Sequence, residues 1–274
     1  MSQPPLILLL DMDGTLIGDT TLQVCRNEIG RLIKRRCRTL DDELSSGILR
    51  PHFESFVKTI KTRYQNIEIY IYTAADRQWA NVMINCIECC LGMKFNRPLF
   101  CREHCIIENG TVIKSTSRIL PIIYKKLKGK YNLKVQDALY KQVVLIDNSY
   151  VIISNERHKF IKCPSYEYFS PCDVISGLSD LDIDSHIGGI TSILSKYKLI
   201  SGEQTEAWKV KSQYYNTLSQ LYKSASQSGN KNKKDADMFW LIMERIFRNY
   251  SFKSFNSKVV TYINTKLNEG GYRA

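Results

Sequence analysis

The segment Pro5-Leu-Ile-Leu-Leu-Leu-Asp-Met-Asp-Gly-Thr15 decides the fold of this chain. Its apolar run from Leu6 to Leu10 is short and continuous, a pattern typical of a strand buried on both faces of a parallel sheet. One acid follows the run directly, and a second stands two residues later, before a turn at Gly14. The segment therefore predicts a central strand with two carboxylates at its carboxyl end.

Two further segments have the same form. Ile67-Glu-Ile-Tyr-Ile-Tyr-Thr73 is rich in β-branched and aromatic residues, and Val143-Val-Leu-Ile-Asp147 is apolar and ends in an acid. Helical patterns are predicted over residues 22–38, 52–64 and 76–91. Strands that alternate with helices predict an α/β fold with a parallel sheet. Ligands bind beyond the carboxyl ends of such strands, so we expect Asp11, Thr73 and Asp147 at one site.

The carboxyl-terminal quarter of the chain has a different character. Residues 203–223 and 238–250 have helical patterns, and the linker between them, 224–237, is polar and rich in Gly, Ser and Lys. We therefore expect an α/β domain over 1–199 and a basic helical extension over 200–274. The second of the two helices is unusually apolar and is expected to fold back on the α/β domain.

The composition excludes several classes of protein. A chain of 274 residues with 43% hydrophobic and 24% charged residues can bury a globular core. No apolar run approaches the roughly 18–20 residues that span a bilayer, so no membrane partner is expected. Nine cysteines without a secretory signal favour an intracellular protein, cytoplasmic or nuclear, with reduced thiols. The net charge of +12 favours an anionic partner such as a phosphorylated group or nucleic acid.

The paired acids suggest a particular chemistry. One carboxylate can attack phosphorus as a nucleophile, and its neighbour can protonate the leaving oxygen and later deprotonate water. Two carboxylates and a phosphate repel one another unless a cation offsets their charge. Mg²⁺, which prefers oxygen ligands, meets that requirement. Asp11 and Asp13 are therefore candidates for phosphoryl transfer that depends on Mg²⁺.

The motif Asp11-Met-Asp-Gly-Thr-Leu16 resembles the first motif of the haloacid dehalogenase (HAD) superfamily. Later motifs resemble, in family order, those of the phosphatases that act on the RNA polymerase II C-terminal domain. They are Arg50-Pro51 with Phe53 and Phe56, Ile71-Tyr-Thr-Ala-Ala75, Leu99-Phe-Cys-Arg-Glu-His-Cys105 with Lys114, and Val144-Leu-Ile-Asp-Asn-Ser149. The resemblance implies a HAD-like Rossmannoid parallel sheet flanked by helices, followed here by the helical extension.

The resemblance also implies roles for individual residues. Asp11 resembles the nucleophile and Asp13 the general acid and base. Thr73 resembles the hydroxyl that binds a phosphate oxygen, and Lys114 resembles the lysine that pairs with phosphate and nucleophile. The residues that match the family's Mg²⁺ site are Asp11, Asp13, Asn148 and Asp147. The residues that match its substrate channel are Arg102, Trp79 and Ala74.

The function implied is a Mg²⁺-dependent phosphatase that hydrolyses phosphoserine or phosphothreonine in protein through an aspartyl-phosphate, with the RNA polymerase II tail as a candidate substrate. Gly14, where these phosphatases often have Glu, and the net charge of +12 keep an alternative open. That alternative is a phosphatase acting on nucleic-acid 3′ ends or another phosphate ester. A catalytically silent binding protein on the same fold is a third hypothesis, and retention of Asp11, Asp13, Lys114 and Asn148 argues against it.

Overall fold

The computed structural model describes residues 4–18, 28–29, 32, 44–166, 183–196, 200, 206–229 and 237–270. The chain forms two compact units. The sheet unit consists of Met1–Gly18, Leu49–Tyr166 and Asp237–Ala274, and the second unit consists of Asp19–Ile48 and Glu167–Ala236.

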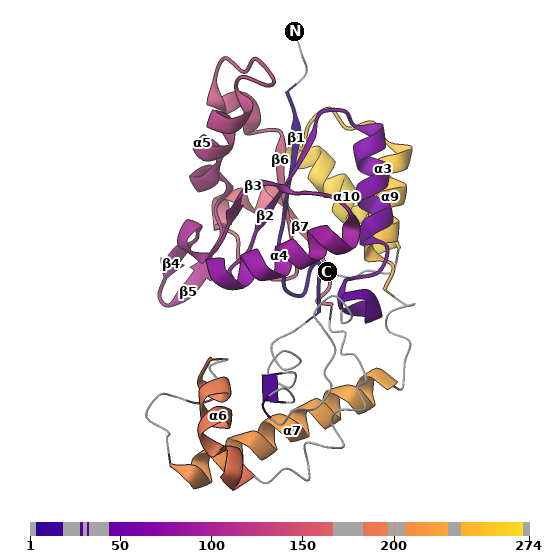
Figure 1. The fold of residues 1–274 in the computed structure, drawn as a ribbon. Helices are drawn as coiled ribbons and strands as arrows, with labels where there is room; N and C mark the ends of the chain where they lie inside the picture. Colours follow the sequence, from indigo (N-terminus) through magenta and orange to yellow (C-terminus); the bar gives the residue numbers. More distant parts are fainter. Residues whose placement is uncertain are drawn as a thin grey trace. The chain divides into compact units, whose positions relative to one another are not determined.

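The sheet unit is built on five parallel strands in the order β3-β2-β1-β6-β7 (Figure 1). Their bounds are β1 Leu6–Leu10, β2 Ile67–Tyr72, β3 Asn96–Phe100, β6 Val143–Asp147 and β7 Phe160–Lys162. Strand β1 lies at the centre, and all of its residues are buried, as the continuous apolar run predicts. The predicted parallel α/β architecture is confirmed.

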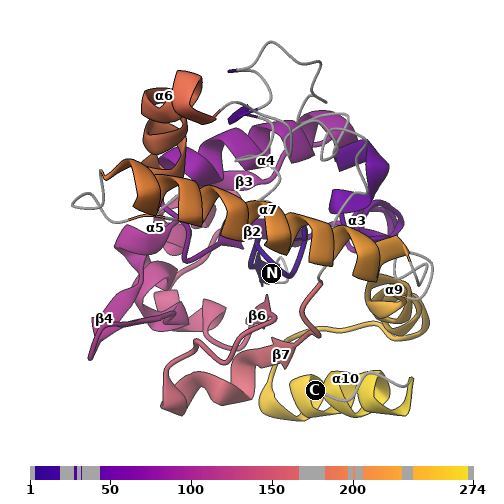
Figure 2. The same cartoon turned by 90° about the horizontal axis from the view of Figure 1, so that it is seen from below.

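Helices cover both faces of this sheet. Helices α3 (Phe53–Arg63) and α4 (Arg77–Leu91) join β1 to β2 and β2 to β3, two steps in the same direction, so right-handed crossovers place both on one face. Helix α5 (Thr116–Leu127) precedes β6, on the other side of β1, and covers the opposite face (Figure 2). It follows a short hairpin of β4 (Ile106–Glu108) and β5 (Thr111–Ile113).

The last two helices belong to the sheet unit. Helix α9 (Phe239–Asn249) packs along α3, and α10 (Ser257–Glu269) packs against α9 and β7. The ring of Trp240 is fully buried and lies 4.9 Å from those of Phe53 and Phe56. The predicted folding back of this apolar segment is confirmed. The expected boundary between residues 199 and 200 does not separate the two compact units. Helices α9 and α10, which follow that boundary, pack with the sheet and belong to the sheet unit.

In the second unit, α6 (Ile183–Lys196) packs against α7 (Ala207–Gly229). Helix α7 continues through residues 224–229, so the helix ends six residues later than the pattern over 203–223 predicts. Ser, Gln, Lys and Ala all tolerate a helix, and the glycine at its end is a common terminator. Residues 230–236 lie outside the described residues, as does most of the helix predicted over 22–38.

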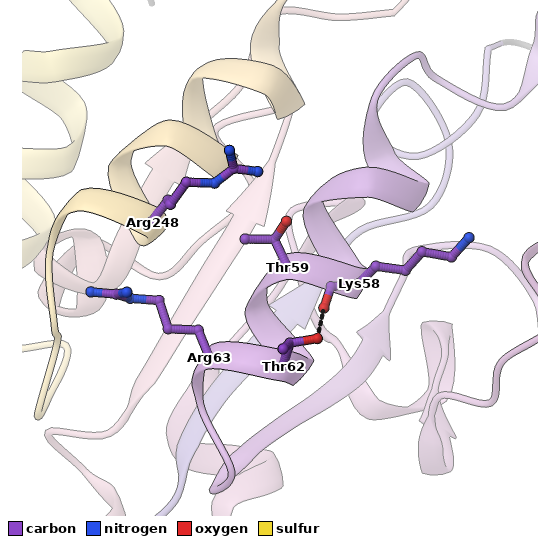
Figure 3. A pocket seen from close by; sticks show the side chains of 5 residues that line it. All are labelled: Lys58, Thr59, Thr62, Arg63 and Arg248. Atoms are coloured by element: carbon purple, nitrogen blue, oxygen red, sulfur yellow. Dashed lines mark hydrogen bonds between the residues drawn. The ribbon is translucent and has the colours of Figure 1, made fainter.

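A basic hollow of about 470 Å³ lies between α3 and α9 (Figure 3). It is lined by Lys58, Thr59, Thr62, Arg63 and Arg248. None of the residues predicted to bind phosphate or metal lines it. Within the part of the chain that the structure describes, no helix combines the length and the apolar character needed to cross a bilayer.

The packing of Trp240 gives a first prediction. Trp240→Ala should lower the free energy of unfolding by about 3–5 kcal/mol, because it leaves a cavity between α3 and α9. The indole N–H of Trp240 has no hydrogen-bond partner within the described structure, so Trp240→Phe should cost only about 1–2 kcal/mol. Urea unfolding of both variants measures the difference. Equal, small losses would contradict the packing of α9 on α3.

Candidate active site

The site begins where β1 and β6 end. The two strands are paired in parallel with Leu10 opposite Ile146, and the backbone N–H of Asp11 donates to the carbonyl of Ile146 at 3.0 Å. This register brings Asp11 beside Asp147, although 136 positions separate them in the sequence. Both carboxylates are buried, at 6% and 1% exposure. The predicted meeting of these two strand ends is therefore present in the structure.

Lys114 lies between the two acids. Its Nζ is 2.6 Å from Oδ1 of Asp11 and 2.6 Å from Oδ2 of Asp147, and its side chain is 1% exposed. The main chain of Lys114 forms a bridge with Ile152, which places the lysine over the loop after β6. Two carboxylates and one ammonium leave the cluster with an excess negative charge when all three groups are ionised.

The pKa values reflect that excess. Burial raises the pKa of Asp11 from 3.8 to about 6; the ammonium of Lys114 opposes this rise, and the carboxylate of Asp147 adds to it. Burial alone would lower the pKa of Lys114, but the charges of Asp11 and Asp147 outweigh it and raise the pKa above its ordinary range. The lysine therefore stays protonated, and Asp11 is mostly ionised at neutral pH.

Asp11 and Asn148 both contact the hydroxyl of Thr15. Its Oγ1 lies 3.3 Å from Oδ2 of Asp11 and 3.3 Å from Oδ1 of Asn148, and it accepts the backbone N–H of Asn148 at 3.1 Å. Gly14 has φ +74°, and a Cβ there would overlap the side-chain amide of Asn148. A glycine at this position thus permits the amide to reach the turn that carries Asp11.

These oxygens fit a hard cation. A carboxylate oxygen of Asp11 and the amide oxygen of Asn148 converge on one hydroxyl, which has a single proton for both. Mg²⁺ takes such oxygen ligands and keeps several waters. Within the described residues no group of three or more His, Cys, Asp or Glu side chains is placed to hold a metal ion. A Mg²⁺ ion here would therefore depend on one carboxylate, an amide, main-chain oxygen and water.

Asp13 is half-buried, in the turn after β1. Its backbone is bridged to Ile17, and the N–H of Gly14 donates to the carbonyl of Ile17 at 2.7 Å. The turn reverses the chain within a few residues of Asp11, as expected. The roles predicted for Asp13 in proton transfer and metal binding stay predictions.

The residues predicted to bind substrate gather around the end of β2. Thr73 is 1% exposed, and its Oγ1 accepts the N–H of Ala75 at 3.1 Å. Arg102 donates from Nε to the carbonyl of Ala74 at 2.8 Å, which ties the two loops together. Trp79 is half-buried in the first turn of α4, where its backbone N–H donates to the carboxylate of Asp76. Thr73 directly follows the last residue of β2, Tyr72. The ring centroid of Tyr72 is 5.7 Å from Nζ of Lys114, so the end of β2 lies close to the lysine.

Arg50 and Thr15 belong to the sequence motifs, but the sequence alone predicts no role for either residue. Arg50 is 1% exposed; its Nη1 lies 3.4 Å from the carbonyl of Thr15 and 2.9 Å from that of Pro164. It also forms an ion pair, at 3.0 Å, with Asp237, which lies two residues before the first residue of α9. The sequence signal was an Arg-Pro pair before an apolar helix, but the acid that neutralises the arginine lies 187 positions away.

The fold and this cluster define an α/β protein with a buried carboxylate–lysine site at the carboxyl edge of its sheet. The sequence profile of the NLI interacting factor-like phosphatases matches residues 6–179, more than half of the chain. The chain therefore belongs to the NLI interacting factor-like phosphatase family, as its motifs predict. A comparison with curated proteins gave no significant match.

Solved structures of RNA polymerase II CTD phosphatases are similar to this chain. One is fission yeast Fcp1 bound to beryllium fluoride, with 18% identity and a TM-score of 0.37 over 97% of this chain and 64% of that one. Another, described as Fcp1, an essential RNA polymerase II CTD phosphatase, has 17% identity and a TM-score of 0.37 over 85% of this chain and 66% of that one. The chain thus spans about two thirds of the length of these proteins.

The contact between Gly14 and Asn148 gives a second prediction. Gly14→Ala should displace the Asn148 amide and strain the turn, lowering the free energy of unfolding by about 2–4 kcal/mol. Gly110→Ala is the matched control, because Gly110 has φ +75° but open space around a Cβ. It should cost only the backbone strain, about 1 kcal/mol. Similar losses in both variants, measured by denaturant unfolding, would show that the amide of Asn148 is not packed on this turn.

Proposed function

We propose that this protein is a Mg²⁺-dependent phosphatase that removes phosphate from phosphoserine or phosphothreonine in protein through an ester on Asp11. The observation that supports this most is the ammonium of Lys114, 2.6 Å from the carboxylates of both Asp11 and Asp147 in a buried site. A buried lysine beside an ionised acid at a sheet edge suits binding of a phosphoryl group.

The first step forms and breaks one bond at phosphorus. An oxygen of Asp11 attacks phosphorus while the bond to the serine or threonine oxygen breaks, and that oxygen takes a proton from Asp13. In the second step Asp13 recovers a proton from water. The water oxygen then bonds to phosphorus, and the bond between phosphorus and Asp11 breaks, which regenerates the carboxylate and releases phosphate.

Charge neutralisation supplies most of the catalysis in such a reaction. The ammonium of Lys114 keeps Asp11 ionised and can contact the transferred group from the same position. Asp11, Asn148 and the main-chain oxygen of Asp13 would hold Mg²⁺, with Asp147 beside it. Bound there, the ion offsets the negative charge of the carboxylates and phosphate. Thr73 would donate a hydrogen bond to a phosphate oxygen.

The substrate class rests on the family and on charge. The family is one of phosphatases, and the net charge of +12 suits an anionic polymer such as a phosphorylated protein. The similar structures are phosphatases of the RNA polymerase II CTD, which makes that tail the first candidate.

Nucleic-acid 3′ ends are the second candidate substrate, because the positive net charge favours them equally. The discriminating experiment measures phosphate release from a phosphoserine peptide, a 3′-phosphorylated oligonucleotide and a small phosphate ester. We expect the peptide to give the highest kcat/KM, with activity lost on chelation and restored by Mg²⁺. A higher kcat/KM for the oligonucleotide would reverse the assignment of substrate. Peptide binding without phosphate release in Mg²⁺ would favour a silent binding protein.

Asp11→Asn separates chemistry from folding. Turnover should fall at least about 10⁴-fold, because an amide is a poor nucleophile at phosphorus. The variant should still fold, so near-wild-type turnover would show that the nucleophile is a different residue. BeF₃⁻, which mimics a phosphorylated carboxylate, should inhibit the wild-type enzyme and bind the variant weakly.

The pKa of Asp11 predicts how this variant alters stability in metal-free buffer. The folded chain keeps the Asp11 proton up to pH about 6, whereas the unfolded chain loses it near 3.8, so the free energy of unfolding falls as pH rises through this range. Asp11→Asn removes that loss and should be more stable than wild type by roughly 1–3 kcal/mol at pH 7. The difference should vanish near pH 4. A variant less stable than wild type at pH 7 would contradict the buried excess charge.

A further inference from the structure

Glu156 makes an unusually complete set of hydrogen bonds beside Lys114. The residue lies in the short helical turn η4 (Ser154–Lys159) and is 2% exposed. Its carboxylate accepts from the three residues that follow Lys114. The donors are Ser115 Oγ at 3.3 Å, Thr116 N at 2.6 Å, Thr116 Oγ1 at 2.9 Å, Ser117 N at 3.0 Å and Ser117 Oγ.

These donors form the start of helix α5. The first N–H groups of a helix have no partner inside the helix, and a side chain at the residue before it usually accepts from one of them. Ser115 occupies that position and makes no such bond. Glu156 supplies the missing acceptor from a distant part of the chain, and its negative charge suits the positive end of the helix dipole.

The segment before Glu156 also holds the main chain of Lys114. The backbone N–H of Lys114 donates to the carbonyl of Val151 at 2.5 Å, and its carbonyl accepts the N–H of Ile153 at 3.0 Å. Both polar groups of the Lys114 backbone are thus fixed by the loop that follows β6. The direction in which its side chain leaves the backbone is set by this loop and by the start of α5.

The hydrogen bonds to Glu156 favour its ionised form. Burial would raise its pKa, but the hydrogen bonds from Ser117 and Thr116 outweigh burial and lower the pKa below its ordinary value. The nearby ammonium of Lys159 lies 3.4 Å from Thr116 Oγ1 and 3.0 Å from the ring centroid of Tyr140. Burial lowers the pKa of Lys159 to about 8, and the charge of Glu156 opposes this. The carboxylate is therefore ionised at neutral pH.

We propose that Glu156 is a positioning residue for phosphoryl transfer: it locks the start of α5 and so holds the ammonium of Lys114 between Asp11 and Asp147. Its part in catalysis rests on the proposed function, but its effect on the position of Lys114 does not. The link joins the loop after β6, which carries Asn148, to the segment that carries the lysine. A shift of either segment by about 1 Å is enough to cost about 100-fold in rate.

The test compares Glu156→Gln with a matched control, Glu88→Gln. Glu88 is another buried glutamate, 1% exposed, and it accepts Phe95 N at 2.9 Å and Arg97 Nη1 at 2.7 Å at the end of α4. In each variant an amide replaces a buried carboxylate of the same shape, so both lose charge-assisted hydrogen bonds and some stability. Of these two glutamates, only Glu156 accepts hydrogen bonds from the residues that follow Lys114.

The first readout does not need turnover. Reductive methylation at pH 8, followed by mass spectrometry of the peptide that contains Lys114, measures how well this amine is protected. We expect Lys114 to react about tenfold faster in Glu156→Gln than in wild type, because its ion pairs open more often, and at the wild-type rate in Glu88→Gln. Unchanged protection in Glu156→Gln would overturn the proposal.

The second readout is the kinetics. We expect kcat of Glu156→Gln to fall about 10- to 100-fold with KM for the phosphopeptide within about twofold, because Glu156 acts through Lys114 rather than on the peptide. Equal losses of kcat in both Gln variants would reduce Glu156 to a structural role. If the wild type releases no phosphate but Lys114 loses protection in Glu156→Gln, the proposed function fails and the positioning role stands.

A milder variant guards against misfolding. Ser117 is exposed and donates to Glu156 through both its N–H and its hydroxyl, so Ser117→Ala removes one bond without opening the core. It should lower kcat about threefold and raise the reactivity of Lys114 by a similar factor. Glu156→Asp, which keeps the charge on a shorter side chain, should recover part of both losses. If Ser117→Ala changes neither kcat nor the reactivity of Lys114, the proposal is also overturned.

Discussion

The contact on which the site depends is the ammonium of Lys114 between the carboxylates of Asp11 and Asp147. It joins the ends of β1 and β6 to the segment before α5. Without the lysine, two buried carboxylates would face each other across adjacent strands, an arrangement that burial and mutual repulsion both oppose. The pairing of the apolar strands fixes the positions of Asp11 and Asp147. The positive charge of Lys114 offsets part of the free-energy cost of burying these two carboxylates.

Arg50, which is distant in sequence, stabilises the turn after β1. Arg50 is buried with only Asp237 as a close carboxylate among the described residues, and its remaining donors face the carbonyls of that turn and of Pro164. Because Asp237 lies two residues before α9 and accepts the N–H of Phe239, the arginine links the site to the helix whose Trp240 fills the core beside α3. The C-terminal helices are thus part of the structure that supports the site rather than an appendage to it.

The sequence was informative where the signal is local. The apolar runs at 6–10 and 143–147 predict buried parallel strands, and the motifs around them predict that Asp11, Lys114 and Asp147 lie together, as the structure shows. Partners that are set by tertiary packing were not predictable in this way. Nothing near Glu156 in the sequence indicates that it accepts from Ser115 to Ser117, and Asp237 lies in a segment that composition assigned to a linker. Helix α5 was missed, because Pro121 and a run of lysines obscure its apolar face.

The charge of the cluster explains why its residues serve binding better than stability. One lysine cannot neutralise two buried acids, and the raised pKa of Asp11 shows that the ionised form opposes folding. A cation beside Asp11 and Asn148 would offset that charge, so ligand binding and folding are linked at this site. The folded state tolerates the unfavourable burial of these charges. The paired strands and the hydrogen bonds of Glu156 hold Asp11, Asp147 and Lys114 in place whether or not a ligand is bound. The excess negative charge at Asp11 thus leaves the site ready to bind a positively charged ligand that the chain itself does not supply.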